Sequence, residues 1–279
     1  MKKVLDYHFD AIVVGGDQVW RIEDTKGVGN NYFLDFISLQ DTIKISYSAS
    51  FGTDRWGGSS EQTAEIKKLL EDFYAVSVRE ESGVNICSNY FGISAECVLD
   101  PTLLLDTAIY KNIIGKTREK PRKETLITYV LDYSDEKKKI VDQIASYKGY
   151  SIYSLYKKGK YQIYHSVQDF LTGLYNAGFI VTDSYHGMIF AIIFNKPFLV
   201  IGNTKRGLAR FQSLLGILGL QERMILEYDR HAVEHIISTD IDYSSVSSLL
   251  KQEINQSKNF LIKGLGLIKK EKLGNENIN

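Results

Sequence analysis

Short apolar runs alternate with amphipathic segments along the chain, and the clearest example lies between Ala177 and Asn203. Phe179 to Val181 has the length of a buried strand, and Met188 to Phe194 is apolar nearly all round, as in a buried helix. Asn195-Lys196-Pro197 ends that helix, because the residue before a proline is disfavoured in helical geometry. Phe198 to Ile201 is the next apolar run. The pattern predicts a parallel strand-helix-strand unit.

Polar residues occupy the turn between the first strand of this unit and its helix. Thr182-Asp183-Ser184 offers side-chain oxygens suited to a helix N-cap, and Tyr185-His186-Gly187 follows in the first turn. Ligands of open parallel sheets bind at the carboxyl ends of the strands, and a helix N-terminus favours an anion. One interpretation is an anion site that contains His186. A capped core helix with an incidental histidine has about equal weight on local pattern alone.

A similar strand end lies near the start of the chain. Ala11 to Val14 predicts a buried strand, and Gly15-Gly16 predicts a sharp turn that needs small residues or positive φ. The G-x-G-x-x-G spacing of a dinucleotide-binding turn is absent. Asp17 follows the turn and is a candidate for catalysis, with capping of the next segment as an equal alternative.

The rest of the first half continues the alternation, with a cap-like Ser59-Ser60-Glu61-Gln62 before its first helix. Arg79 directly follows one of the predicted strands, where a guanidinium can bind an anion with two parallel hydrogen bonds. The alternative is a salt bridge to Glu80 or Glu81, since such exposed pairs are common and weak. The predicted strands are Ile43–Ala49, Tyr74–Val78 and Ala95–Leu99, and the predicted helices are Ser59–Phe73 and Ser82–Phe91.

The composition changes between Asp106 and Glu124, where a basic, proline-containing run lacks an apolar period. We interpret it as a linker; a nucleic-acid patch is the weaker alternative, because no aromatic residues are interleaved. Gly264 and Gly266 are expected to break the second half of a C-terminal helical segment, and the tail from Lys269 is expected to fray. The predicted strands of the second half are Thr125–Leu131 and Tyr150–Leu155, besides the two named above, and the predicted helices are Asp135–Tyr147, Ser166–Tyr175, Arg206–Leu218 and one or two within Tyr243–Ile268.

These elements predict an α/β fold with two domains, which also fits a length of 279 residues. The predicted division is 1–107 for the N-terminal domain, 108–124 for the linker, 125–240 for the C-terminal domain, and 241–279 for C-terminal helices and a polar tail. Each domain is expected to place its site at the carboxyl ends of its strands.

Composition narrows the function classes. The net charge is zero with a pI near 7, so there is no electrostatic case for nucleic acid as a partner. The two cysteines, Cys87 and Cys97, lack metal-type clustering and fit a reducing compartment. The first ten residues contain no signal-peptide apolar region, and no run approaches the ~18 apolar residues of a membrane span. These features predict a cytoplasmic protein without a transmembrane segment or a bound metal.

Four segments, taken together and in order, resemble the polysaccharide pyruvyl transferase family. Each is short, but all of them lie at predicted strand ends, and the likeness extends over roughly residues 10–220. The segments are Val14-Gly15-Gly16-Asp17-Gln18-Val19-Trp20, Ser77-Val78-Arg79-Glu80-Glu81-Ser82-Gly83, Leu99-Asp100-Pro101-Thr102, and Thr182-Asp183-Ser184-Tyr185-His186-Gly187 with Asn195-Lys196-Pro197-Phe198.

The resemblance implies two Rossmann-like domains in the arrangement called GT-B. It implies transfer of pyruvate from phosphoenolpyruvate to two hydroxyls of a sugar, which gives a ketal and phosphate. The partners are then phosphoenolpyruvate and a glycan or lipid-linked saccharide acceptor, without any further cofactor. Family members usually carry an extra strand-helix portion before the segment matching Asp10, and only nine residues precede it here. The resemblance leaves two alternatives: an N-terminal domain that lacks its first βα units, or a sequence that is a piece of a longer chain.

The resemblance also implies roles for individual residues. The acidic residue after the glycine turn falls on Asp17, and the histidine of the helix-start motif falls on His186. Histidine is the more natural acid for the methylene carbon, and an ionised aspartate can accept the proton of a hydroxyl; sequence also allows the reverse assignment. The other residues expected to bind substrate are Arg79, Lys205, Arg206, Ser184, Tyr185, Gly187 and Gly16.

Two other function classes fit the same sequence features. A nucleotide-sugar glycosyltransferase of GT-B type would also use an anion site at a helix N-terminus, since a fold does not determine a function. A non-catalytic glycan-binding remnant is the other class, because of the short N-terminus.

Overall fold

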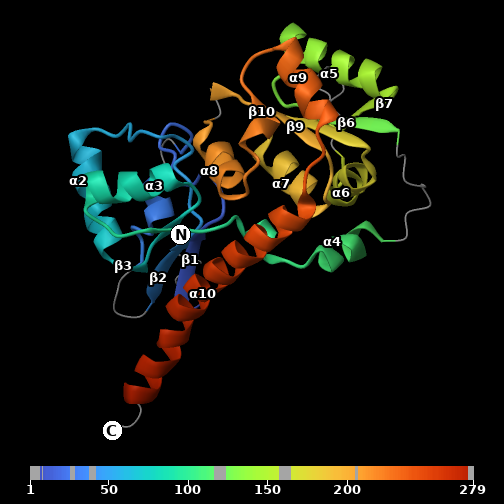
Figure 1. The fold of residues 1–279 in the computed structure, drawn as a ribbon. Coiled ribbons are helices and arrows are strands. Elements are labelled where there is room, and N and C mark those ends of the chain that lie inside the picture. Colours follow the sequence, from blue (N-terminus) through green and yellow to red (C-terminus); the bar gives the residue numbers. More distant parts are fainter. Residues whose placement is uncertain are drawn as a thin grey trace. The chain divides into compact units, whose positions relative to one another are not determined.

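The computed structural model describes residue 7 and residues 9–25, 29–37, 42–115, 124–156, 165–204 and 207–275 (Figure 1). The chain forms two compact units. The first unit contains Met1–Leu104, Arg206–Leu214 and Leu249–Asn279, and the second contains Leu105–Lys205 and Leu215–Ser248. Both units are α/β, with sheets of parallel strands, as the sequence pattern predicts.

The first unit is built on a three-stranded parallel sheet in the order β1-β2-β3 and a two-stranded parallel pair, β4-β5. An isolated bridge between Ala49 and Val78 continues the pairing beyond the ends of these strands. The elements are β1 (Ala11–Gly15), a 3₁₀ helix η1 (Gly29–Phe33), β2 (Ile43–Tyr47), α2 (Ser60–Glu71), β3 (Phe73–Ala75), β4 (Ser77–Val78), α3 (Glu81–Ile86), a π-helical turn η2 (Cys87–Phe91), β5 (Glu96–Cys97) and a 3₁₀ helix η3 (Pro101–Leu104).

Sequence and structure agree closely at α2. Ser59 is its N-cap, and Gln62 completes the capping box by accepting a bond from the Ser59 backbone N–H. The core beside it contains Trp20, whose ring stacks on Phe33 at a centroid distance of 5.1 Å. The prediction that β1 is a buried strand is wrong, because β1 lies at the edge of the sheet and Val13 is 45% exposed.

The C-terminal helix differs from the sequence prediction. α10 (Tyr243–Asn275) is a single helix that continues through Gly264 and Gly266 and beyond Lys269. Phe260 is buried and packs in a cluster with Ile45 of β2, and a Cβ on Gly264 would lie 3.3 Å from the Ile45 side chain. The missing side chain at Gly264 therefore lets the helix approach β2, and this packing outweighs the roughly 1 kcal/mol helix penalty of each glycine.

The second unit contains a five-stranded parallel sheet in the order β10-β9-β8-β6-β7 (Figure 1). The chain moves outward from β6 to β7 and then returns past β6 to β8, so the topological switch point lies between β6 and β8. The elements are α4 (Thr107–Ile114), β6 (Thr125–Tyr129), α5 (Asp135–Lys148), β7 (Ser151–Ser154), α6 (Val167–Asn176), β8 (Phe179–Thr182), α7 (Tyr185–Ile193), β9 (Phe198–Ile201), a 3₁₀ helix η5 (Gln221–Arg223), β10 (Met224–Ile225) and α9 (Arg230–Ser238). The helix α8 (Ala209–Ile217) is divided between the units, because its residues up to Leu214 belong to the first.

Helices cover both faces of this sheet. Figure 1 shows α5 and α9 on one face and α6 and α7 on the other. Strand residues of alternate register, among them Leu126, Phe179 and Leu199, pack against α5 and α9 in one apolar cluster. The helix predicted from the apolar run after Ser184 is α7, and its residues from Gly187 to Ile192 are buried.

The segment boundaries differ in part from the sequence prediction. α4 lies where the linker was expected to begin, and residues 116–123 are outside the described part of the chain. Residues 206–214 and 249–279 group with the first unit, although they follow strands β6 to β9 of the second unit in sequence. Within the described residues, no helix combines the length and the apolar character needed to cross a membrane.

Candidate functional site

Asp17 lies on a tight glycine turn at the end of β1. Gly15 and Gly16 have φ angles of 141° and 82°, and a Cβ on Gly15 would lie 2.1 Å from the carbonyl oxygen of Tyr47. Only glycine therefore fits at this turn. The Asp17 carboxylate accepts the N–H of Gln18 at 2.8 Å, while its side chain is 64% exposed. The turn thus presents a carboxylate to solvent at the carboxyl end of the first unit's sheet.

The buried side chain of Arg79 contacts this turn. Its guanidinium is out of solvent contact and pairs with Asp100 at 2.8 Å and with Asp17 at 3.6 Å. It also donates to the carbonyl oxygen of Gly16. Asp100 is itself buried and accepts bonds from the Thr102 backbone and hydroxyl. Arg79, which the sequence suggested as an anion-binding residue, thus binds two carboxylates of the protein itself and the glycine turn.

A second arginine reaches Asp17 from far along the chain. Arg210, in α8, places one guanidinium nitrogen 3.8 Å from the Asp17 carboxylate, and its side chain is 8% exposed. Neither Arg210 nor Asp100 is assigned a role from the sequence. The sequence gives one hint of a role for Arg210, which is that a charged residue stands among the apolar positions of α8. Its contact with Asp17 could not be predicted, because no sequence pattern reports contacts between residues so far apart.

Glu80 fixes the loop that follows β2. Its buried carboxylate accepts the Ser50 hydroxyl at 3.0 Å and the backbone N–H groups of Phe51 and Gly52 at 2.8 and 3.0 Å. Burial raises the pKa of the Glu80 carboxyl, although these hydrogen bonds and the charges of Arg79 and Arg210 favour its ionised form. Glu80, which the sequence suggested as an exposed salt-bridge partner of Arg79, is therefore a buried residue that holds this loop in place.

Glu80→Gln is expected to make stability less dependent on pH. A raised carboxyl pKa means that the wild-type side chain contributes most below its unfolded pKa and loses that contribution as pH rises through the folded pKa. The stability advantage of wild type over Glu80→Gln, measured by urea unfolding, should therefore shrink as pH rises above the unfolded carboxyl pKa of about 4.3. Glu61→Gln is the control, because the pKa of exposed Glu61 is lowered, chiefly by its bond with Ser59, and its trend has the opposite sign. An advantage that grows with pH would contradict the raised pKa of the buried Glu80 carboxyl.

In the second unit, Asp183 connects the loop after β8 to the loop after β6, at the switch point. Its buried carboxylate accepts the backbone N–H groups of Leu131 and Asp132 at 2.7 and 3.1 Å and the Lys137 ammonium at 2.6 Å. Leu131 and Asp132 follow β6, whereas Asp183 follows β8. The residue that the sequence offered as a helix cap therefore fixes the edge where open parallel sheets bind ligands.

His186 lies in the first turn of α7 at the same edge. Ser184 is the N-cap and accepts the Gly187 N–H at 3.5 Å. Ser184, Tyr185 and Gly187 are buried, whereas His186 is partly exposed and its ring meets the Tyr185 ring edge-on at 5.9 Å. A Cβ on Gly187 would lie 2.3 Å from the Thr182 hydroxyl, so glycine permits this close packing. Of these four residues, His186 is the one that is partly exposed.

The predicted site residues that the structure describes thus form two groups, one in each unit. Gly16, Asp17 and Arg79 gather at the strand ends of the first unit, and Ser184, Tyr185, His186 and Gly187 gather at those of the second. Lys205 and Arg206 lie outside the described residues. The pairing of Asp17 with His186 stays a prediction.

Other reactive groups in the described residues do not form a competing centre. Burial raises the pKa of the Cys87 and Cys97 thiols to about 12, so neither is a thiolate nucleophile near neutral pH. In the part of the chain that the structure describes, no cluster of three or more histidine, cysteine, aspartate or glutamate side chains has the arrangement to hold a metal ion.

Comparison with known proteins identifies the family. The family described as "Polysaccharide pyruvyl transferase" matches residues 1–205, which include Asp17, Arg79 and His186. A solved structure titled "Crystal Structure Analysis of the Glycotransferase of kitacinnamycin" is similar at 15% identity and a TM-score of 0.46, over 94% of this chain and 75% of that one. No curated protein matches the chain. Because the family match covers well over half of the sequence, the chain belongs to the polysaccharide pyruvyl transferase family.

Proposed function

We propose that the chain transfers the pyruvyl group of phosphoenolpyruvate to two hydroxyls of a glycan or lipid-linked saccharide. Membership of the family supports a transferase that modifies polysaccharides. The observation that carries the proposal to this chain is the position of His186, partly exposed in the first turn of α7 beside the switch point of the sheet. A histidine at that place combines a titratable proton with an anion-favouring helix N-terminus.

The reaction balances with one acid and one base. A proton is added to the methylene carbon of phosphoenolpyruvate, and positive charge develops at C2. The first sugar hydroxyl attacks C2 and loses its proton, phosphate leaves, and the second hydroxyl closes the ketal and loses its proton. Of the two protons that the hydroxyls lose, one restores the acid that protonated the methylene carbon, and the other leaves with phosphate. We assign His186 as the acid and Asp17 as the base, because an ionised aspartate accepts but does not donate.

The donor carries a phosphate and a carboxylate, so its site needs positive charge. The N-terminus of α7, with Ser184, Tyr185 and Gly187, is the proposed anion-binding element of the second unit. Lys205 and Arg206 remain proposed donor contacts. Arg79 also remains one, although a direct contact requires its pairs with Asp17 and Asp100 to open. Through the Gly16 carbonyl and Asp17 it already acts on the position of the proposed base.

Phosphate release tests this proposal. The chain is incubated with phosphoenolpyruvate and a panel of neutral glycans, and phosphate is measured together with the carboxylated product. The expected result is release that requires both donor and glycan. A parallel reaction contains a nucleotide sugar in place of phosphoenolpyruvate. Release of a nucleoside diphosphate in that reaction, with no phosphate released from phosphoenolpyruvate, would instead indicate a glycosyltransferase. Saccharide binding without turnover of either donor would indicate a glycan-binding remnant.

A further inference from the structure

The second unit contains a pocket at the end of the sheet opposite to His186. It has a volume of about 750 Å³, within the ~300–1,000 Å³ range of ligand pockets. Ala177 and Gly178 precede β8, and Pro197 precedes β9, so the pocket opens at the amino ends of these strands. His186 follows the carboxyl end of β8. The pocket is therefore separate from the edge assigned to the donor.

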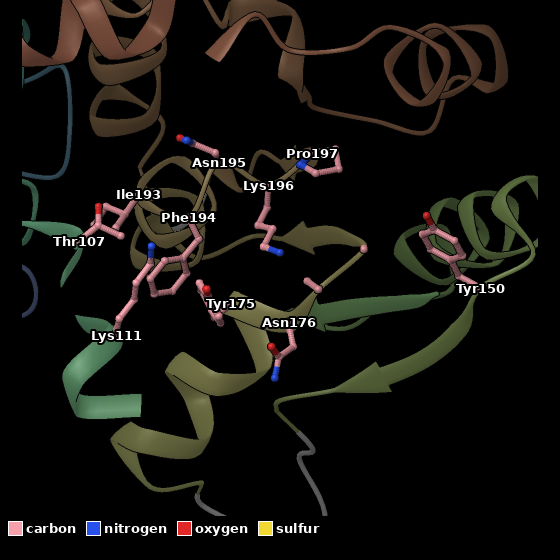
Figure 2. Close-up of a pocket in the computed structure, with 12 residues that line it drawn as sticks. Thr107, Lys111, Tyr150, Tyr175, Asn176, Ile193, Phe194, Asn195, Lys196 and Pro197 are labelled. Atoms are coloured by element: carbon pink, nitrogen blue, oxygen red, sulfur yellow. The ribbon is translucent and has the colours of Figure 1, made fainter. Parts of the chain in front are cut away.

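Two lysines flank one aromatic ring in this pocket. Figure 2 shows Tyr175 between the side chains of Lys111 and Lys196. The two ammonium groups lie 5.9 and 5.6 Å from the centre of the Tyr175 ring, which is the range of a cation–π contact. None of the twelve described residues that line the pocket carries a carboxylate. The two charged residues of this lining are thus both lysines.

The backbone that carries Lys196 is held rigidly. Asn195 has a φ of 51°, the left-handed conformation that ends α7. The Lys196 N–H bonds to the Ala191 carbonyl at 2.8 Å, and the Lys196 carbonyl accepts the hydroxyl of partly buried Tyr243. The Pro197 carbonyl accepts the Ile180 N–H at 3.0 Å, which fastens the turn to β8. Such anchoring lowers the entropy lost when a ligand is bound.

The same pocket also has uncharged polar side chains in its lining. Thr107, Asn176 and Asn195 carry hydroxyl and amide groups, which can hydrogen-bond to the hydroxyls of a sugar. An inorganic anion would leave these groups unused. A saccharide that carries a carboxylate suits both kinds of side chain, because its hydroxyls bond to the polar groups while its carboxylate pairs with a lysine.

We propose that this pocket binds a saccharide that carries a carboxylate. The class of ligand rests on the proposed function, because the pyruvyl ketal places a carboxylate on the glycan. A product-binding pocket remote from the donor edge would retain the chain already modified, while further sugars of the same polymer react.

Binding is tested without donor, so that the result does not depend on turnover. The probes are a pyruvylated methyl galactoside, its unmodified parent, methyl glucuronide and inorganic phosphate, each titrated against the full chain by calorimetry or NMR. The two acidic sugars are expected to bind at least about tenfold more tightly than the neutral parent. Equal affinity of acidic and neutral sugars would overturn the proposal, and so would phosphate competing as well as the acidic sugars.

Variants locate the binding. Lys111→Met with Lys196→Met is expected to weaken the acidic sugars at least about tenfold and to leave ketal formation on a small acceptor unchanged. Lys148→Met is the matched control, since this ammonium lies 6.0 Å from the Tyr147 ring outside the pocket. Unaltered binding of methyl glucuronide in the double variant would overturn the site. If the wild-type chain binds methyl glucuronide through these lysines yet never forms a ketal, the pocket stands and the proposed function fails.

Discussion

Replacing His186 with alanine is expected to lower the turnover of pyruvyl transfer by on the order of 10²-fold or more, with little change in the free energy of unfolding. The loss follows from the assigned role, because no other group of the α7 turn is placed to deliver a proton: Ser184, Tyr185 and Gly187 are buried. His186 is partly exposed, so the truncation leaves no large cavity. Asp17→Asn, which keeps the shape of the side chain, is expected to lower turnover by a similar factor.

A purely structural role for His186 predicts a different result. A histidine that only packs against its neighbours would, when removed, lower the melting temperature and spare the chemistry. Initial rates and melting temperatures are therefore measured on the same preparations. His231→Ala is the control, because this side chain of α9 is 92% exposed. Near-normal transfer by a well-folded His186→Ala protein would remove His186 from the mechanism.

The second large effect is expected at Arg79, in stability. Arg79→Met removes the partner of buried Asp100 and leaves a carboxylate without its cation, which typically costs about 3–5 kcal/mol. That loss is a large part of the roughly 5–15 kcal/mol that stabilises a protein of ordinary stability. The free energy of unfolding from urea titration measures it.

Companion variants keep this prediction testable if Arg79→Met folds poorly. Adding Asp100→Asn removes the uncompensated charge and should restore part of the stability, since the two residues act as a pair. Arg230→Met on α9 is the control for loss of an arginine, because its pair with Glu234 is exposed, and it should change stability little. If Arg79→Met were as stable as the Arg230→Met control, the buried network beneath Asp17 would not support the fold.

Local chemistry explains what the sequence predicted correctly. The strand-helix-strand pattern around His186, the N-cap at Ser184 and the stop before Pro197 depend on residues near one another in the chain. The capping box at Ser59 and the turn at Gly15-Gly16 are similarly local. For these elements, apolar period and turn chemistry indicate the same structure.

Long-range packing explains the rest. The pair between Arg210 and Asp17 joins residues nearly two hundred positions apart, and the clamp of Glu80 on Phe51 and Gly52 crosses from one strand end to another. No local pattern encodes such contacts. The continuity of α10 through Gly264 depends on Ile45 of another element, so helix propensity alone gave the wrong result. For the same reason Arg79, placed correctly after its strand, was not recognised as buried.

The origin of the product's methyl group is the most direct test of the central claim. The chain is supplied with phosphoenolpyruvate labelled with carbon-13 at C2 and a glycan acceptor in deuterated water, and the products are followed by NMR. The account predicts that the labelled carbon becomes a ketal carbon on the glycan, that its methyl group gains a single deuterium from the acid, and that phosphate appears in equal amount. Phosphate release that leaves the label in free pyruvate, or a glycan product that carries no labelled carbon, would contradict it.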